Sequence, residues 1–325
     1  MNAKRMLDAA VFAALIIGVS MLIPVAASAQ LNGHNLRGDF GLGSGSQAPP
    51  GVYAGMFYIN YDVDSVRNRN GDEIRIGEGD ASLTVQGIAP ALWWVSQHQL
   101  FGANYAFLVV PSFLNTGLEA PARGLDVDTG LSAGDLYVRP IELGWHKPRA
   151  DFLAAVSFFA PVGKYDPGAR DNTGLGMWTF ELSGGTTVFL DEARTWNLAT
   201  TAFWETHSEK EDSNDKVGDL LTLEGGFGKS FVQGAINIGV AYYAQWKLTE
   251  DEIDLALPAI ELLTFNKHQV FGIGPDITFP IASGQKLIAL VNVRYEVEFG
   301  AESTTEGNML VLSALFPLGG MGPAE

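Results

Sequence analysis

The sequence predicts an all-β protein, a transmembrane antiparallel up-and-down β-barrel of about 12 strands. Three observations support this: an export signal at the N-terminus, about twelve segments of alternating apolar and polar residues, and connections that are alternately long and short. Transmembrane barrels combine such strands with long extracellular loops and short periplasmic turns. Hydrophobic residues make up 47% and charged residues 18% of the chain, a composition that excludes a disordered acidic protein.

Residues 1–29 have the features of a secretory signal peptide. Lys4 and Arg5 form a basic start, residues 11–23 supply an apolar core, and Ala27 to Ala29 offer a small-residue cleavage site before Gln30. An uncleaved membrane anchor is the alternative, because the apolar stretch is nearly long enough to span a bilayer. We expect export through the periplasm and cleavage after residue 29.

Residues 30–50 are rich in glycine and too irregular for a membrane strand. Two interpretations stay open for them. The segment either folds back into the barrel as a plug, where glycine permits close backbone approach, or forms an exposed periplasmic linker. A phosphate-binding loop is excluded because no Lys and Ser/Thr pair follows at the required spacing. The plug candidates are Asp39, Phe40, Gly41, Gly43 and Gly45.

The predicted barrel spans residues 51–318, and its first strand, 51–64, shows the alternation most clearly. Odd positions such as Tyr53, Phe57 and Tyr61 are apolar or aromatic, whereas the even positions end in polar residues such as Asn60 and Asp62. Successive side chains of a strand point to opposite faces. We expect the odd face to contact lipid, with tyrosines at both membrane interfaces, and the even face to line the lumen.

The same alternation predicts the remaining strands. They are expected at 80–94, 104–114, 134–146, 152–161, 176–190, 196–207, 219–231, 235–246, 267–279, 284–299 and 308–318. Within 134–146, Arg139 shares the parity of apolar residues, which predicts a bulge near Pro140. Residues 319–325 form a C-terminal tail.

The connections alternate in length or polarity along the chain. Long or hydrophilic connections are expected at 63–79, 116–133, 162–175, 208–218, 248–266 and 300–307, and compact ones at 95–103, 147–151, 191–195, 232–234 and 281–283. With both termini in the periplasm, every long connection lies outside the cell. A soluble β-sandwich, which also alternates apolar and polar residues, does not require this rhythm.

The run 38–51, continuing into 58–62, resembles the outer-membrane proteins of the "MetA-pathway of phenol degradation" family. Further similarities lie at 142–146, 160–166, 178–181, 272–275, 294–296 and 316–318. The resemblance covers nearly the whole chain after the signal peptide. It implies a barrel transporter of the bacterial outer membrane associated with aromatic-compound catabolism.

Several polar residues fall on predicted lumenal faces. The pore-lining candidates are Glu181, Glu205, Glu224, Asn292, Arg294 and Glu296. Charges inside a barrel can set ion selectivity or bind a solute, or they can pair to stabilise a packed interior. Because acidic residues predominate, we expect an open lumen to prefer cations.

Other functional classes find little support. The net charge of −17 argues against nucleic acid as a partner, and without cysteine there is no disulfide or Cys-ligated metal site. The acidic loops lack EF-hand spacing, and none of the five histidines adjoins a recognisable nucleophile motif. We therefore expect no metal, no cofactor and no enzymatic activity.

The sequence thus predicts a channel for passive uptake of small hydrophobic or aromatic compounds across the bacterial outer membrane. Its expected partners are outer-membrane lipid, lipopolysaccharide and the solute itself, while the oligomeric state stays open. The alternatives are a general small-solute porin and a structural or sensory barrel without transport. Twelve strands lie between filled barrels of eight and aqueous channels of sixteen, so strand number does not decide among them.

Overall fold

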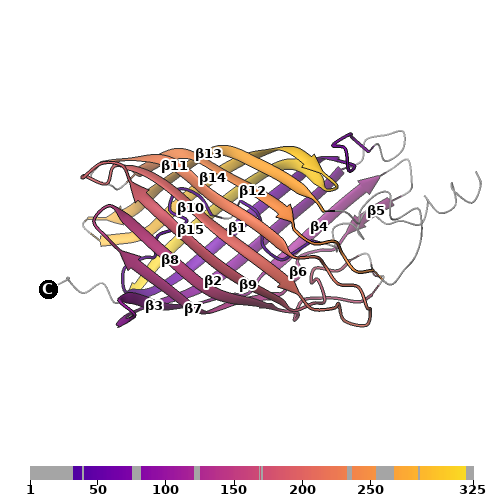
Figure 1. Cartoon of the computed structure of the whole chain (residues 1–325), viewed down its shortest axis with the longest axis horizontal. Coiled ribbons are helices and arrows are strands. Elements are labelled where there is room, and N and C mark those ends of the chain that lie inside the picture. The colour runs from indigo at the N-terminus through magenta and orange to yellow at the C-terminus, as the bar shows by residue number, and fades with distance from the viewer. Residues whose placement is uncertain are drawn as a thin grey trace, which may run out of the picture.

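The computed structural model describes residues 32–38, 40–74, 82–120, 125–167, 169, 171–232, 236–253, 267–284 and 286–319. These residues form fifteen strands (Figure 1). The bounds are β1 Gly51–Val66, β2 Ser82–Leu100, β3 Ala103–Val110, β4 Phe113–Ala120, β5 Leu125–Asp128, β6 Ser132–Ala133, β7 Leu136–His146, β8 Ala150–Ala160, β9 Thr179–Phe189, β10 Trp196–His207, β11 Leu220–Phe231, β12 Ile236–Lys247, β13 Gln269–Ser283, β14 Lys286–Glu302 and β15 Thr305–Gly319.

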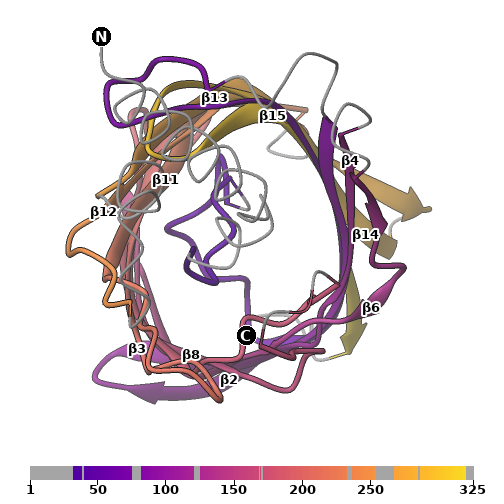
Figure 2. The same ribbon diagram turned by 90° about the vertical axis from the view of Figure 1, so that its right-hand side faces the viewer.

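Twelve of these strands close into one barrel. Around the ring, β1, β2, β3 and then β7 to β15 each pair with the next strand, and β15 pairs with β1. Every pairing is antiparallel, and the view along the axis shows the closed ring (Figure 2). The predicted fold class and strand number are confirmed.

The remaining three strands extend one side of the barrel beyond the ring. The predicted strand 104–114 is divided at Pro111, which lacks the backbone N–H that a ladder needs. Before this point β3 pairs with β2 and β7, whereas after it β4 pairs with the first half of β2 and with β5 and β6. β4 therefore stays beside β2 in the wall, whereas β5 and β6 replace β7 as its neighbours on the other side.

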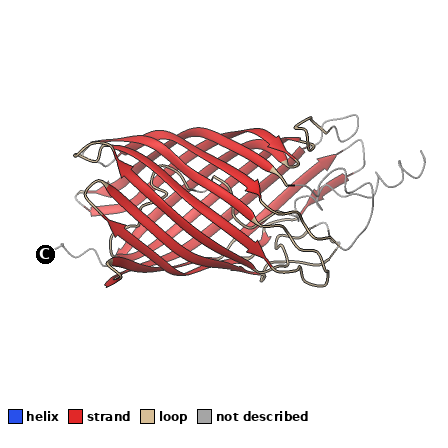
Figure 3. Cartoon of the chain, viewed as in Figure 1, coloured by secondary structure: helices blue, strands red, loops and turns tan. Residues whose placement is uncertain are grey.

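Short and long connections lie at opposite ends of the barrel (Figure 3). The short turns lie at the barrel end where β1 begins at Gly51 and β15 ends at Gly319. These two strand ends lie side by side, because Val52 pairs with Gly319. At that end Phe101 and Gly102 both have positive φ, of 53° and 75°, as a two-residue hairpin turn requires. The connection expected at 300–307 to be long or hydrophilic is short, because β14 and β15 continue to the two-residue turn Ser303–Thr304.

The bulge predicted near Pro140 is present. The register of β7 shifts between Val138 and Ile141 against β8, and the facing register shifts near Ala106 of β3. Arg139 and Glu142 are both buried as a result, at 4% and 1% exposure, although they are three positions apart and regular alternation would put them on opposite faces. The extra residue turns both side chains into the lumen.

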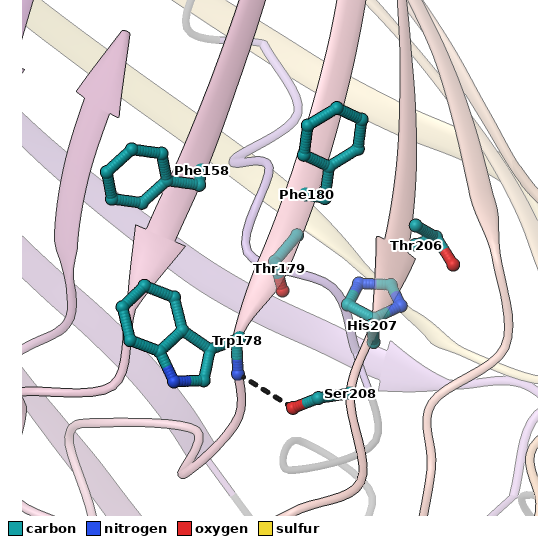
Figure 4. Close-up of a pocket in the computed structure, with 7 residues that line it drawn as sticks. All are labelled: Phe158, Trp178, Thr179, Phe180, Thr206, His207 and Ser208. Atoms are coloured by element: carbon teal, nitrogen blue, oxygen red, sulfur yellow. Dashed lines mark hydrogen bonds between the residues drawn. The ribbon is translucent and has the colours of Figure 1, made fainter. Parts of the chain in front are cut away.

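Large apolar side chains cover much of the outward surface. Trp178, Val240 and Ile273 are between 45% and 53% exposed, values expected for a surface solvated by lipid. At the long-loop end, Phe158, Trp178 and Phe180 line a hollow of about 470 Å³ on this surface, together with Thr206 and Ser208 (Figure 4). Such aromatic groups are typical of the membrane interface.

The expectation that the odd-numbered face of β1 contacts lipid is wrong. Ile59 packs with Met309, Val311 and Leu36, and Leu36 belongs to the chain that lies inside the barrel. Tyr53, Phe57 and Tyr61 share this inward face, whereas Asn60 and Asp62 point outward and hydrogen bond to Gln86 and Thr84 of β2. The apolar face of β1 and β2 is therefore lumenal. Alternation determines the period of a strand but not which of two apolar surroundings its apolar face meets.

The expected signal peptide, residues 1–29, lies outside the described residues. The expected tail, 319–325, also lies outside them except for Gly319, which ends β15. The described residues contain no helix long and apolar enough to cross a membrane.

The sidedness can be tested with single cysteines, because the chain has none. Glu211 is exposed in the connection between β10 and β11, and Glu192 is exposed in the short turn between β9 and β10. In intact cells we expect a membrane-impermeant maleimide to label Glu211→Cys but not Glu192→Cys. Permeabilising the outer membrane should make both variants react; the reverse pattern in intact cells would contradict the orientation.

Candidate functional site inside the barrel

Residues 32–38 and 40–50, hereafter the lumenal segment, lie inside the barrel (Figure 2). The segment enters at the short-turn end, where Pro49 accepts a hydrogen bond of 2.7 Å from Tyr53. It continues through the lumen to the opposite end, where His34 contacts Thr179 at the start of β9. The segment therefore runs the length of the barrel, from the short-turn end to the long-loop end. These ends are called periplasmic and extracellular below, after the orientation expected from the sequence.

At the extracellular end the segment is held by its backbone and by His34. The amides of His34 and Asn35 both donate to Glu205, at 3.1 and 2.8 Å. The two ring nitrogens of His34 lie 2.7 Å from Thr179 and 2.8 Å from Asp135, and the ring stacks on Phe159.

Asp135 connects this end of the segment to an extracellular loop. It accepts the His34 contact and also the amides of Gly163 and Leu175, at 2.9 and 2.7 Å. Burial raises the pKa of the Asp135 carboxyl, but the His34 contact and these amides outweigh it and hold the pKa below its usual value. Burial lowers the pKa of His34, outweighing the opposing effect of Asp135, so the neutral ring is favoured while the segment is in place.

In the middle of the lumen, Arg37 and two backbone amides bind acidic side chains. Arg37 donates to Glu298 at 2.7 Å, and both groups are almost fully buried. The amides of Gly38 and Phe40 donate to the two oxygens of Glu224, at 3.0 and 2.9 Å. Each pairing supplies a buried carboxylate with donors that water cannot provide there.

Nearer the periplasm the contacts continue with the same chemistry. The amide of Leu42 donates to Asp276 at 3.2 Å, and its carbonyl accepts from Asn197. Ser46 donates to Asp151 at 2.8 Å, and Gln47 donates to Glu142 at 3.0 Å. The contacted carboxylates, hereafter the acidic wall, are Glu142, Asp151, Glu181, Glu205, Glu224, Asp276 and Glu298.

Two glycines allow the segment to approach this wall closely. A Cβ on Gly45 would lie 2.2 Å from the backbone of Thr186, and one on Gly41 would lie 1.9 Å from the carboxylate of Asp276. At Gly43 a Cβ would meet nothing within 4 Å. Close contacts with the barrel therefore require glycine at positions 41 and 45 but not at position 43. Phe40 packs 5.2 Å from Phe203, and Asp39 lies outside the described residues.

The structure places all six predicted pore-lining residues on lumenal faces. Glu181 and Glu205 are register partners on β9 and β10, and both contact Asn35 through hydrogen bonds. Glu224 binds the segment as described, and Glu296 lies against Gly38. Arg294 and Asn292 instead lie beside Asp276, with Asn292 donating to it at 2.5 Å. That these residues line a pore stays a prediction.

Sequence reasoning missed several residues of this site. Arg37, the principal cation of the segment, stood among glycines without a periodic pattern to mark its position. Asp276 was detectable, because it lies opposite Phe271, Ile273 and Ile277 in a predicted strand. Asp135 and Asp151 lie at strand ends, where alternation carries no signal.

The opposite side of the lumen is apolar. Register partners share a face in antiparallel strands, so the inward residues of β1 fix those of β2 and β15. This apolar strip comprises Tyr53, Phe57, Ile59, Leu83, Val85, Ala89, Ala91, Trp93, Val95, Leu108, Leu114, Met309, Val311 and Leu315. Among these, Phe57, Val85 and Leu108 remain partly exposed inside the barrel.

The lumenal segment covers the apolar strip at two places. Leu36 packs on Ile59, Met309 and Val311, and Ala48 packs on Tyr53 and Val95. Between these places the amides of Gly38, Phe40 and Leu42 donate to carboxylates of the acidic wall. The lumen is thus divided lengthwise into a wall that binds the chain's own segment and a strip that it covers only at its ends.

No group of three or more His, Asp and Glu side chains in the described part of the chain is arranged to hold a metal ion. The acidic wall is occupied instead by backbone amides and side-chain donors of the lumenal segment.

Comparison with known proteins identifies the family. Residues 63–314 match the model of the family described as "Putative MetA-pathway of phenol degradation". The chain belongs to this family. Its barrel is a bacterial outer-membrane barrel, as the solved structures of the same fold also indicate. A comparison with curated proteins found no match.

Solved structures give the fold. An outer-membrane channel from Pseudomonas putida F1 is similar with a TM-score of 0.71 and 16% identity, covering 87% of this chain and 99% of that one. The β domain of the Bordetella autotransporter BrkA gives 0.47 at 11% identity, covering 83% and 100%. A Pseudomonas aeruginosa FadL homologue gives 0.41 at 10% identity, covering 83% and 91%.

Close packing of the segment predicts different effects for two glycine variants. Gly45→Ala must displace backbone at Thr186, which costs about 1–3 kcal/mol and should raise the population with a displaced segment about 5- to 150-fold. Gly43→Ala, two residues away in open space, is the matched control and should behave as wild type. Open probability in a planar bilayer measures the difference; equal values in two folded variants would contradict the packing.

The histidine contact predicts a pH dependence. In the inserted segment the pKa of His34 lies below 6.5, whereas a released segment regains the ordinary value. The released state therefore binds more protons, and lowering the pH from 6.5 to 5.5 should favour release, by at most about tenfold. Open probability should rise with acid in wild type and stay flat in His34→Gln; the same slope in both would exclude His34 as the cause.

Proposed function

We propose that this protein is a passive outer-membrane channel for small hydrophobic or aromatic compounds, and that the apolar strip carries the solute. The observation behind the proposal is the position of the strip. It lies inside the lumen, where a water-filled pore would place polar groups, and it includes partly exposed side chains such as Phe57, Val85 and Leu108.

The chemistry of the strip suits weak and reversible binding. A benzene-sized solute that buries about 100 Å² of apolar surface gains about 2.5 kcal/mol at 25 cal/mol per Å². That gain draws the solute out of water without trapping it. Repeated along the barrel axis, such contacts would conduct a hydrophobic molecule past the polar surface of the outer membrane without an energy source.

The lumenal segment is the gate in this proposal. Leu36 and Ala48 cover the strip near its two ends, so a solute passes when these parts of the segment move aside. The acidic wall holds the segment in the lumen while the channel is closed. We also propose that the acidic wall gives cation preference to the opened lumen.

The comparisons are compatible with this proposal. The family description names a pathway of phenol degradation, and the similar structure from Pseudomonas putida F1 is named an outer-membrane channel. Outer-membrane lipid and lipopolysaccharide would surround the barrel. The absence of enzymatic activity and of a cofactor stays a prediction.

Uptake of a hydrophobic dye tests the strip. N-phenylnaphthylamine is excluded by intact lipopolysaccharide and fluoresces when it enters a membrane, so its rate of entry reports the permeability to hydrophobic molecules. Expression of the wild-type protein should accelerate entry. Phe57→Asn should lose most of this gain, because an amide in the middle of the strip removes apolar contact and adds a group that must be desolvated.

Tyr58→Asn is the matched control, since Tyr58 is the next residue of β1 and points to the outward face. It should retain wild-type dye entry at equal amounts of folded barrel. Equal loss in both variants would contradict a lumenal route, and no acceleration by the wild type would favour a structural or sensory barrel.

A further inference from the structure

The environment of Arg37 is a recognition site for a guanidinium group. The Nε of Arg37 donates to Glu298 at 2.7 Å, Nη1 donates to Gln245 at 3.3 Å, and Nη2 donates to Tyr61 at 3.1 Å and Thr305 at 3.3 Å. The guanidinium carbon also lies 5.5 Å from the centre of the Tyr61 ring. A guanidinium group is planar and carries several N–H donors, so a site with one anion, several neutral acceptors and an aromatic face is complementary to it.

The barrel builds this site without the segment. Glu298 of β14 accepts hydrogen bonds of 2.6 Å from Tyr61 of β1, 2.6 Å from Tyr243 of β12 and 2.8 Å from the amide of Gly307 in β15. Tyr243 is 2% exposed and Glu298 is 5% exposed. Four strands thus orient one carboxylate in a dry pocket, and we call Glu298, Tyr61, Tyr243, Gln245 and Thr305 the guanidinium cage.

Arg37 occupies the cage as a tethered ligand. Elsewhere the segment binds the barrel through hydrogen bonds of backbone amides, a hydroxyl and a carboxamide, which carry no positive charge. When the segment withdraws, the three neutral donors stay on Glu298, but its cationic partner leaves. The vacated cage then holds an oriented carboxylate that has lost its charge partner, and this favours a replacement cation.

We propose that the guanidinium cage is a ligand site for a guanidinium-bearing solute, and that such a solute opens the lumen by taking the place of Arg37. The proposal rests on the proposed function only in that the segment moves; the nature of the transported solute does not enter it. Leu36, the neighbour of Arg37, covers the apolar strip, so loss of Arg37 from the cage releases the cover at this end.

The form of the cage distinguishes this ligand class from other cations. An ammonium ion is a compact point charge and cannot present a planar set of donors to Glu298, Gln245, Tyr61 and Thr305 at once. A tethered group acts at an effective concentration in the millimolar range, so a free ligand must reach comparable concentrations against wild type. Removing the Arg37 side chain removes this competition.

Calorimetric titration of methylguanidinium chloride into the folded, detergent-solubilised Arg37→Ala variant tests the site. We expect saturable binding to this variant and binding at least about tenfold weaker in Arg37→Ala/Glu298→Gln, which lacks the anion. Arg37→Ala/Glu302→Gln is the matched control: it neutralises the glutamate that ends the same strand, outside the cage, and should bind as Arg37→Ala does. Methylammonium chloride should not bind saturably.

Absence of saturable binding to a folded Arg37→Ala variant, or equal binding of methylammonium, would overturn the proposal. If Arg37→Ala fails to fold, the wild-type channel provides the test: methylguanidinium should raise its open probability in a planar bilayer above the value in equimolar methylammonium. Equal values in the two salts would overturn it. Dye entry through wild type without either salt tests the transport proposal separately.

Discussion

Buried carboxylates are the constraint on which the rest of this structure depends. The acidic wall places seven of them inside one barrel, and several are almost fully excluded from solvent. Ionised carboxylates buried in a barrel need hydrogen-bond donors, and the neighbouring strands provide only some of these donors. The lumenal segment supplies the remainder from backbone amides, a guanidinium, a hydroxyl and two carboxamides. Its glycines follow from this role, because only a chain without Cβ at Gly41 and Gly45 reaches the wall.

The same constraint leaves the other half of the lumen free for different chemistry. Because the segment is drawn to the acidic wall, it meets the apolar strip mainly through Leu36 and Ala48. A barrel filled uniformly by side chains would have no such division. Here one side holds a removable part of the chain, and the other offers a surface along which an apolar molecule can move. Gating and conduction then depend on separate sets of residues.

The sequence was sufficient for the barrel itself, because alternation over twelve segments is a repeated signal that individual errors do not erase. Even Phe152 to Ala160, apolar on both faces, took its place as β8 between strands that were clear. Pro140 was recognisable as a bulge because Arg139 broke the parity. The inward orientation of β1 was not, since lipid and an apolar strip accept the same side chains.

The site required contacts that local patterns do not encode. Arg37 and Glu298 are 261 residues apart. The alternation of β14 places Glu298 on a lumenal face, but no local pattern marks Arg37 or indicates that the two residues pair. Glu181, Glu205 and Glu224 were identified because they lie on the polar faces of strands whose other face is apolar. Their partner, the backbone of a glycine-rich segment, has no side-chain signature. Sequence reasoning therefore found one half of the interaction and left the plug and linker interpretations open.

Single-channel conductance after deletion of residues 30–50 tests the central claim most directly. The described strands of the barrel begin at Gly51, so the ring of twelve keeps all its pairings in this variant. If the segment occupies the lumen, the full-length protein should show rare openings, and the deletion should give stable steps with cation preference from the uncovered acidic wall. Unchanged conductance in a demonstrably folded barrel would contradict the account.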